Sequence, residues 1–367
     1  MPSLAARRVV TPTGVLAPGV VEVDGGRITH VGPTTGLVPD RVLVPGLVDL
    51  QVNGIVDVDV AAASGADWDT LDAHLVAQGV TTWCPTLVTA PLDRYAEPLA
   101  RIAGAAARPG PCPAIAGAHL EGPFLGGRPG AHPPDLIIPP DREWLDGLDD
   151  IVVLVTMAPE PEGAVAAIEA LVGRGRLVSL GHSSATVEQA TAGIDAGARL
   201  VTHGFNGMSG LDHRAPGMVG ALLTDDRVAV SLIADLVHVH PTALSVAFRC
   251  KPVDQVVLVT DAVAWRRGDV GGIGLVHDGT APRLRDGTLA GSALTLDQAV
   301  ANVVGHCGVT LERAVAAAST NPARLLGLAD RGTIETGRRA DLVALDPDTL
   351  RATETWIQGT QVHGPRL

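Results

Sequence analysis

Polar and titratable side chains recur at the ends of successive apolar segments of this 367-residue chain. In chain order they are Gln51, Asn53, His119, Glu121, His182, His203, Asn206, Asp235, His238 and Asp261. Two neutral imidazoles and one carboxylate are a usual catalytic ligand set for Zn²⁺ or Fe²⁺, because they leave positions open for water and substrate. We therefore predict that Glu121, His182 and His203 hold one divalent metal per subunit, Zn²⁺ or Fe²⁺. Each histidine alone could instead be a hydrogen-bonded core or loop residue, so the prediction depends on the three together.

Asp261 lies in the segment LVTDA, at the end of the last of these apolar runs. A metal ion lowers the pKa of bound water from 15.7 to about 7. A neighbouring carboxylate can accept the released proton and return it to a leaving amine. An aspartate at this position could also be a helix N-cap. Beside a metal site, we expect Asp261 to be the general base and acid of a hydrolase.

The usual ligands of a second metal are missing. Some barrel hydrolases bridge two metals with a carbamylated lysine at a strand end, but the single lysine, Lys251, precedes the last apolar run. The first run carries Gln51 and Asn53, where an HxH pair would supply two further ligands. A mononuclear site is therefore favoured.

The elements that must position these residues are short apolar runs that alternate with alanine-rich helical stretches. The strand candidates are residues 46–54, 80–88, 114–122, 151–160, 176–184, 198–206, 228–235 and 255–262, and helices are expected, for example, at 67–78, 161–174 and 186–197. Strand–helix alternation is typical of parallel sheets, and eight repeats favour a closed barrel over an open sheet. Active sites of such barrels form at the carboxyl ends of the strands, so the polar residues should converge there.

The two ends of the chain have a different character. The N-terminal part contains Val-rich alternation with a hairpin signal at Asp24-Gly25-Gly26, and the C-terminal part returns to strand character after helical stretches at 292–308 and 311–327. The sequence thus predicts an α/β protein, with a (β/α)₈ TIM barrel over residues 47–329. A small β-sandwich domain would be built from both termini, residues 1–46 and 330–367. A glycine-rich loop, residues 268–279, is expected after the eighth strand.

Composition limits the possible partners and location. The formal net charge of −13 disfavours binding to nucleic acid or anionic membranes, whose charge has the same sign, although a local pocket can still bind an anion. No apolar run approaches the ~18 residues of a membrane span, and the N-terminus is unlike a signal peptide. The four cysteines, at positions 84, 112, 250 and 307, form no CxxC pair. We interpret them as buried free thiols and expect a cytoplasmic protein.

A series of motifs extends over nearly the whole chain. In order they are PGLVDLQVNG, HLEGPFL, GHSSAT, THGFNGMSG, IADLVHVHP, LVTDA, TLAGSALTLDQAV, TNPARLLGL and GTIETGRRADLVALD. Together they resemble the N-acetylglucosamine-6-phosphate deacetylases of the amidohydrolase superfamily. HLEGP and the LAGS block are the specific part of this resemblance, whereas the last motif is common among amidohydrolases. The resemblance implies hydrolysis of the acetamide of N-acetylglucosamine 6-phosphate to glucosamine 6-phosphate and acetate.

The resemblance also implies roles for individual residues. Glu121, His182 and His203 are the implied metal ligands, Asp261 is the implied base and acid, and His132, beside Ala131, would lie near the acetamide carbonyl. Asn206 and Gly207 would line the sugar site, and the segment Leu289, Ala290, Gly291 and Ser292 would close over the substrate.

Two further residues would bind the phosphate of this phosphorylated amino-sugar substrate. They are His238 and Arg214, with Arg214 reaching in from the neighbouring subunit of a homodimer. Arginine suits this role because its fork makes bidentate contacts with phosphate. On sequence alone, an arginine in a loop is usually just solvated, and His132 among prolines is a loop residue.

This chain departs from the family pattern near the site. After Asp261 the stretch AVAWRRGDV replaces a small, polar one, so Trp265, Arg266 and Arg267 add bulk and charge near the mouth. Gly204 and Gly207 stand where the family more often has a larger residue and alanine. These differences bear on the sugar pocket more than on the reaction type.

Two alternatives were weighed against this hypothesis. One is a related amidohydrolase that acts on another N-acetyl amino sugar or on a cyclic amide; a phosphate-binding Arg214 would have no use with a neutral ring. The other is a catalytically inactive barrel that serves as a binding or scaffold protein. In an inactive barrel at least one of the predicted metal ligands or the predicted base should be replaced, whereas all three ligands and the base are present.

Overall fold

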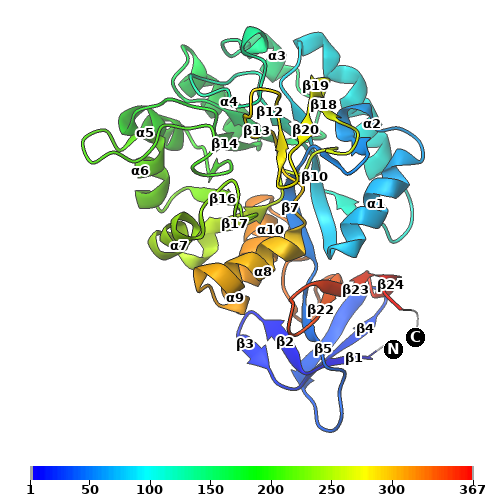
Figure 1. Cartoon of the computed structure of the whole chain (residues 1–367). Coiled ribbons are helices and arrows are strands. Elements are labelled where there is room, and N and C mark those ends of the chain that lie inside the picture. The colour runs from blue at the N-terminus through cyan, green and yellow to red at the C-terminus, as the bar shows by residue number, and fades with distance from the viewer. Residues whose placement is uncertain (1–2, 366–367) are drawn as a thin grey trace.

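A closed barrel of eight parallel strands forms the centre of the molecule in a computed structural model that describes residues 3–365 (Figure 1). The strands are β7 (Leu47–Val52), β10 (Val80–Val88), β12 (Ala118–Glu121), β13 (Val152–Met157), β14 (Leu177–Leu180), β15 (Leu200–Val201), β16 (Ala229–Ile233) and β17 (Val256–Val259). The ring closes between β7 and β17 through the parallel bridge of Val52 with Ala262. Each strand lies within a predicted run, so the predicted (β/α)₈ barrel is confirmed.

The barrel strands are buried on both faces, which explains their composition. Strands covered on both sides are expected to be continuous Val, Ile and Leu runs, and β17 has the sequence VVLV with all four residues buried. In β10 only the last residue, Val88, is partly exposed. The polar side chains of the predicted site follow at or just beyond the carboxyl ends of these strands.

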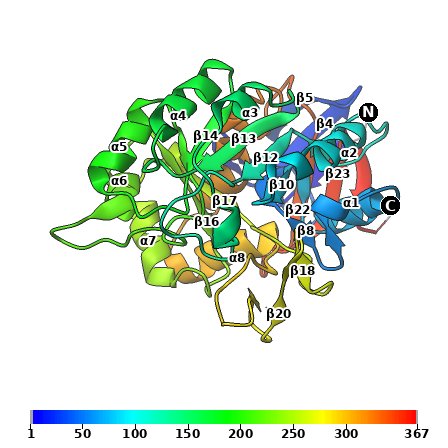
Figure 2. The same cartoon turned by 90° about the horizontal axis from the view of Figure 1, so that it is seen from above.

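Helices surround the barrel (Figure 2). They are α1 (Asp67–Ala77), α2 (Ala96–Ala106), α3 (Arg142–Asp146), α4 (Ala164–Gly173), α5 (Val187–Asp195), α6 (Gly217–Thr224), α7 (Pro241–Cys250), α8 (Leu296–Cys307), α9 (Leu311–Val315) and α10 (Asn321–Leu325), with 3₁₀ turns at Val60–Ala62, Leu92–Arg94, Pro134–Leu136 and Val253–Gln255. The three predicted helices correspond to α1, α4 and α5. The helical stretch expected at 311–327 is divided into α9 and α10 by a π-helical turn, Ala316–Thr320.

Additional sheets are built from both ends of the chain. One contains β24 (Thr360–His363), β23 (Ala352–Ile357), β22 (Leu342–Leu345), β6 (Val42–Pro45), β2 (Arg8–Thr11) and β3 (Gly14–Leu16), and the other contains β1 (Ser3–Ala6), β4 (Gly19–Asp24) and β5 (Arg27–Pro33). The predicted hairpin joins β4 to β5 through Gly25 and Gly26, both at positive φ (53° and 77°). These sheets share a hydrophobic cluster of their own, which includes Ile28, Leu43 and Trp356. We propose residues 1–46 and 330–367 as the bounds of this small β domain.

The segment after the eighth strand differs from the prediction. The predicted glycine-rich loop 268–279 folds into two hairpins, β18 (Asp269–Val270) with β19 (Ile273–Gly274) and β20 (Val276–His277) with β21 (Pro282–Arg283). Together with their flanks we call residues 265–291 the cover segment, which projects beside the strand ends (Figure 2). Other short strands are β8 (Gly54–Ile55), β9 (Val58–Asp59) and β11 (Ala114–Ile115). Glycines supplied the turns that the sequence indicated, but two-residue strands are too short to leave a periodic signal.

Two predictions from composition can be checked on residues 3–365. No helix there is both long enough and apolar enough to cross a membrane. All four cysteines are free, and Cys84 and Cys307 are buried as expected. The expected burial is wrong for Cys250, which is exposed, and for Cys112, which is half-buried.

Candidate active site

Backbone turns at the strand ends bring the predicted ligands to the barrel axis. Glu121 is the last residue of β12, while His182, His203 and Asp261 each lie two residues beyond β14, β15 and β17. These three residues have positive φ angles of 49°, 30° and 50°. A left-handed backbone at a non-glycine residue costs on the order of 1–3 kcal/mol and concentrates at functional sites. The strain lets each chain segment turn away from its strand while the side chain points inward.

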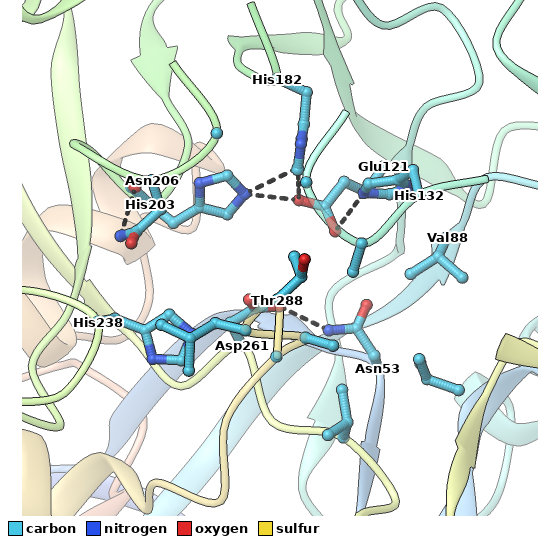
Figure 3. A pocket seen from close by; sticks show the side chains of 18 of the residues that line it. Asn53, Val88, Glu121, His132, His182, His203, Asn206, His238, Asp261 and Thr288 are labelled. Atoms are coloured by element: carbon cyan, nitrogen blue, oxygen red, sulfur yellow. Dashed lines mark hydrogen bonds and ion pairs between the residues drawn. The ribbon is translucent and has the colours of Figure 1, made fainter. Parts of the chain in front are cut away.

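Three ligand atoms meet in one cluster (Figure 3). The Nε2 atom of His203 lies 2.9 Å from Oε1 of Glu121 and 3.0 Å from Nε2 of His182, and the latter lies 3.2 Å from the same Oε1. Ligands at 2.0–2.1 Å from a tetrahedral ion are separated by about 3.3 Å. Nδ1 of His182 lies 3.3 Å from the Arg128 carbonyl oxygen, to which it can donate, leaving the Nε2 lone pair free. The donor set and its spacing therefore fit a divalent cation.

His132 borders the same space. Its Nε2 lies 3.8 Å from Oε2 of Glu121, and one donor atom each of Glu121, His132 and His182 falls within 4.8 Å of the others. The atoms of the group with His203 lie closer together, at 2.9–3.2 Å from one another. Burial and the neighbouring His182 lower the pKa of His132 to about 3. The ring is therefore neutral and able to donate one hydrogen bond toward the cavity.

The carboxylate of Glu121 is held in its charged form. Burial would raise its pKa, but the hydrogen bonds and charges of His182 and His203 outweigh burial and hold the pKa well below its usual range. Burial would lower the pKa of His203, and Glu121 raises it instead. An anionic carboxylate beside two imidazoles is suited to hold a cation.

The pKa of Asp261 is shifted in the opposite direction from that of Glu121. Burial, together with the charge of Glu121, raises the pKa of Asp261 to about 7. Its Oδ1 accepts hydrogen bonds from Nδ2 of Asn53 (2.7 Å) and Nε2 of Gln51 (3.1 Å). A carboxyl group whose pKa is near neutrality can both take up and release a proton at physiological pH. Glu121 thus has the properties of a metal ligand, and Asp261 has those of a base.

Gln51 links these two carboxylates, a role that sequence reasoning missed. Its Nε2 also donates to Oε1 of Glu121 (2.9 Å), and its Oε1 accepts from the hydroxyl of Thr202 (2.9 Å). The Thr202 contact orients the amide so that its N–H groups face the carboxylates. The sequence placed Gln51 and Asn53 among the polar residues at the strand ends, in positions where a second metal would need histidines, but did not indicate these hydrogen bonds.

Glu160, which the sequence analysis did not single out, joins two loops of the site. Its carboxylate accepts from the hydroxyl of Ser183 (2.6 Å), from the N–H of Ser184 (2.8 Å) and from the N–H of Gly127 (3.1 Å). Ser183 follows His182 directly, and Gly127 begins the loop that carries His132. The Glu160 carboxylate therefore holds together the loop that follows His182 and the loop that carries His132. Its position after β13 was the available sequence signal.

A cavity that opens to solvent lies at the cluster. Its lining contains these predicted residues: Glu121, Ala131, His132, His182, His203, Asn206, Gly207, His238, Asp261, Leu289, Ala290 and Gly291. Its lining also contains apolar residues that the sequence did not indicate: Val88, Ile233, Val263, Val270 and Ile273. The structure thus brings most of the predicted site together and adds an apolar wall.

The two ends of this cavity differ in chemistry (Figure 3). One end holds Asn206 and His238, whose Nδ1 lies 2.7 Å from Oδ2 of Asp235. Burial would raise the pKa of Asp235, but His238 outweighs burial and lowers it. The other end holds Val88 beside Asn53 and His132, with Asp261 between the two ends. A substrate that spans the cavity would place a polar group at one end and an apolar group at the other.

Two predicted substrate residues do not line the cavity. The hydroxyl of Ser292 donates to the Thr260 carbonyl oxygen (2.6 Å), and its N–H donates to the Asp261 carbonyl oxygen (2.7 Å). Ser292 therefore anchors the segment before it rather than facing the cavity. Arg214 is exposed in the projecting loop 209–216, whose Leu211 is 61 % exposed. Neither arginine nor lysine is among the residues that line the cavity.

The bulky residues of the AVAWRRGDV stretch also face away from the cavity. Trp265 packs on His277 with ring centroids 4.8 Å apart, and Arg266 pairs with Asp57 at the surface. Arg267 pairs with Asp269. None of these three residues is among those that line the cavity, whereas Val263 and Val270 of the same stretch do line it.

Fold and site together define a class. An eight-stranded β/α barrel with a Glu–His–His cluster at its strand ends and a buried aspartate beside it is a barrel hydrolase with a site for a divalent metal. The model of the amidohydrolase family matches residues 42–365. The chain belongs to this family.

Individual relatives are similar over almost the entire chain. An N-acetylgalactosamine-6-phosphate deacetylase from Escherichia coli O157:H7 is 41 % identical, over 97 % of this chain and 98 % of that protein. An N-acetylglucosamine-6-phosphate deacetylase from Danio rerio is 37 % identical, over 88 % and 85 %. The solved structure of a mutant N-acetyl-D-glucosamine-6-phosphate deacetylase from Mycobacterium smegmatis, in complex with N-acetyl-D-glucosamine-6-phosphate, is 34 % identical with a TM-score of 0.89, over 98 % and 99 %.

Proposed function

We propose that this enzyme hydrolyses the acetamide of N-acetylglucosamine 6-phosphate to glucosamine 6-phosphate and acetate. The observation that carries the proposal is the buried Asp261, held by Asn53 and Gln51 beside the cluster of Glu121, His182 and His203. Deacetylases of N-acetyl amino-sugar phosphates are its relatives at 34–41 % identity.

Glu121, His182 and His203 would hold one divalent cation per subunit, Zn²⁺ or Fe²⁺. When bound, such a cation lowers the pKa of water and polarises a carbonyl oxygen. Gln51 and Asn53 support a single cation, because both present amide N–H groups to Asp261, and an N–H group cannot ligate a metal.

The protons are moved by this chain's own residues. Asp261 takes the proton of the attacking water as general base and then delivers a proton to the departing amine nitrogen. Its pKa near 7 suits both steps. His132, which is neutral, donates a hydrogen bond to the acetamide carbonyl oxygen as negative charge develops there.

The substrate's phosphate would lie at the His238 end of the cavity, with the sugar against Asn206 and Gly207 and the segment 289–292 closing over it. A phosphate needs cationic or N–H donors, and no arginine or lysine among residues 3–365 lines this cavity. Exposed on its projecting loop, Arg214 would supply the charge to the site of the partner subunit in a homodimer. We also propose that the enzyme works in the cytoplasm, where its free thiols would stay reduced.

Subunit complementation tests the role of Arg214. Chains with Arg214→Ala and chains with Asp261→Asn should each have low activity on the phosphorylated substrate. Mixed dimers should regain activity, because one of their two sites would combine an intact Asp261 with an intact Arg214 from the partner. Lack of recovery in verified mixed dimers would contradict a contribution across the interface.

A second candidate substrate is N-acetylgalactosamine 6-phosphate. It is favoured by the 41 % identical relative of that name, which this chain matches over 98 % of its length. The reaction and the roles of the residues would be unchanged, and only the sugar epimer differs.

Acetate release from a panel of substrates tests the proposal. The panel contains both epimers, each with and without the 6-phosphate, and is assayed with Zn²⁺ or Fe²⁺. We expect turnover of at least one phosphorylated epimer and much weaker turnover of the unphosphorylated sugars. Equal rates with and without phosphate would contradict the assignment of the His238 end, and no release from any member would overturn the function.

A further inference from the structure

A second cavity lies beside the catalytic cavity and shares one lining residue with it. Val88, at the end of β10, lines both cavities. The remaining lining of the second cavity is Asp59, Ala61, Ala62, Leu87, Ala90, Pro91, Arg94, Tyr95, Pro98, Arg267, Asp269, Gly271 and Gly272. Most of this lining is apolar, and two of its four charged residues, Arg267 and Asp269, belong to the cover segment.

Val88 is held firmly in this shared position. A Cβ atom added at Gly271 would lie only 2.6 Å from Cγ2 of Val88, so the cover segment packs its backbone directly on the isopropyl group. The Gly271 N–H donates to Oδ2 of Asp59 (3.3 Å), and the hydroxyl of Tyr95 donates to the Val88 carbonyl oxygen (3.1 Å). The Val88 side chain is therefore packed against the cover segment, and its carbonyl group is held by Tyr95.

Val88 also lies at the end of the cavity where an acyl group would point. It is the register partner of Glu121 on the adjacent strand. The N–H of the next residue, Thr89, donates to Nδ1 of His132 (3.4 Å). His238 lies at the opposite end (Figure 3). A substrate with its anionic group near His238 and its amide carbonyl beside Glu121 and His132 directs its acyl chain toward Val88.

We propose that Val88 determines acyl-chain specificity by holding the acetyl methyl group and excluding longer acyl chains from the second cavity. This inference rests on the proposed function and adds the group that the enzyme tolerates on the amide carbonyl. One methylene in a hydrophobic pocket changes kcat/KM by roughly 10–200-fold. Replacing valine by alanine removes two methyl groups and joins the cavities, which gives a propionyl or butyryl chain a place to extend.

The test compares N-acetyl-, N-propionyl- and N-butyryl-glucosamine 6-phosphate with the metal-loaded enzyme. In Val88→Ala, the ratio of kcat/KM for butyryl over acetyl should rise at least ~10-fold. In Val88→Ile, which fills the same place, the propionyl substrate should lose more activity than the acetyl substrate. The control is Ile233→Ala, which enlarges the catalytic cavity away from the second cavity and should leave the ratio within about twofold.

The outcomes separate this inference from the proposed function. An unchanged ratio in Val88→Ala, or an equal rise in Ile233→Ala, overturns the role of Val88. Failure of the wild-type enzyme on every acyl substrate overturns the proposed function instead. In that case, calorimetric titration measures the affinity of the enzyme for acetate and for butyrate. Relative to wild type, the ratio of butyrate affinity to acetate affinity should rise about tenfold in Val88→Ala. An unchanged ratio overturns the inference. Val88→Ile keeps both assays decisive if Val88→Ala does not fold.

Discussion

The two walls of the catalytic cavity are built in different ways. The reacting wall consists of barrel strand ends, where Glu121, His203 and Asp261 are all less than 10 % exposed and joined by hydrogen bonds. The covering wall consists of the cover segment, whose two-residue strands present Val270 and Ile273. Groups that must be aligned for chemistry are thus placed at or just beyond the ends of buried barrel strands, while groups that only need to fit the substrate are placed on short hairpins.

Asp261→Asn should produce the largest effect on the reacting wall. The substitution keeps the shape of the side chain but removes its basicity, so kcat should fall by about 10²–10⁴-fold. Elemental analysis should still find close to one metal per chain, because Asp261 is outside the cluster of Glu121, His182 and His203. Turnover near the wild-type value would contradict the base assignment, and two tightly held metals per chain would contradict the role given to Gln51.

Glu160 tests whether the reacting wall depends on support from neighbouring loops. Glu160→Ala removes the acceptor for Ser183, Ser184 and Gly127 and frees the loop of His182. Loss of such a supporting contact typically costs about 10–100-fold in metal affinity. Competition with a chelator measures this affinity. The matched control, Glu160→Gln, retains one carbonyl acceptor and should lose less metal affinity than Glu160→Ala. Equal metal affinity in wild type and both variants would mean that Glu160 has no positioning role.

Ile273→Ala probes the covering wall at its hairpin tip. Because Ile273 contributes apolar contact and no proton transfer, KM should rise by roughly three- to tenfold, with little change in kcat. Steady-state kinetics with the acetyl substrate measures both values. A loss of kcat as large as that of Asp261→Asn would remove the distinction between the two walls.

Asp59 concerns the attachment of the cover segment, and its expected effect is on stability rather than on catalysis. Burial raises the pKa of Asp59 to about 6 from a usual value of 3.8. Between these values the folded state binds more protons than the unfolded state, so the free energy of unfolding falls as pH rises. From pH 3.8 to 6, wild type should lose stability relative to Asp59→Asn by at most about 3 kcal/mol. Thermal unfolding at several pH values measures the difference; parallel profiles for the two proteins would show that Asp59 is not the titrating group.

The sequence by itself determined the barrel and the reacting residues. Eight apolar runs, six of them followed by polar residues, were sufficient, because a parallel barrel brings the carboxyl ends of all its strands to one face. Residue type and strand-end position therefore indicated Glu121, His182, His203 and Asp261 without any knowledge of their distances. The segments that carry short strands or depend on turns, such as residues 265–291, left no comparable signal.

Only the tertiary structure decided how those residues work together. The amide of Gln51 joins Glu121 and Asp261, which lie 70 and 210 positions further along the chain. The position of Val88 beside two cavities depends equally on Gly271, from a distant segment that packs against it. A pattern along the chain reports which face or strand end a residue occupies, but not which distant side chain lies opposite. Hydrogen bonding, pKa shifts and cavity shape all arise from those pairings, and for that reason they required the folded molecule.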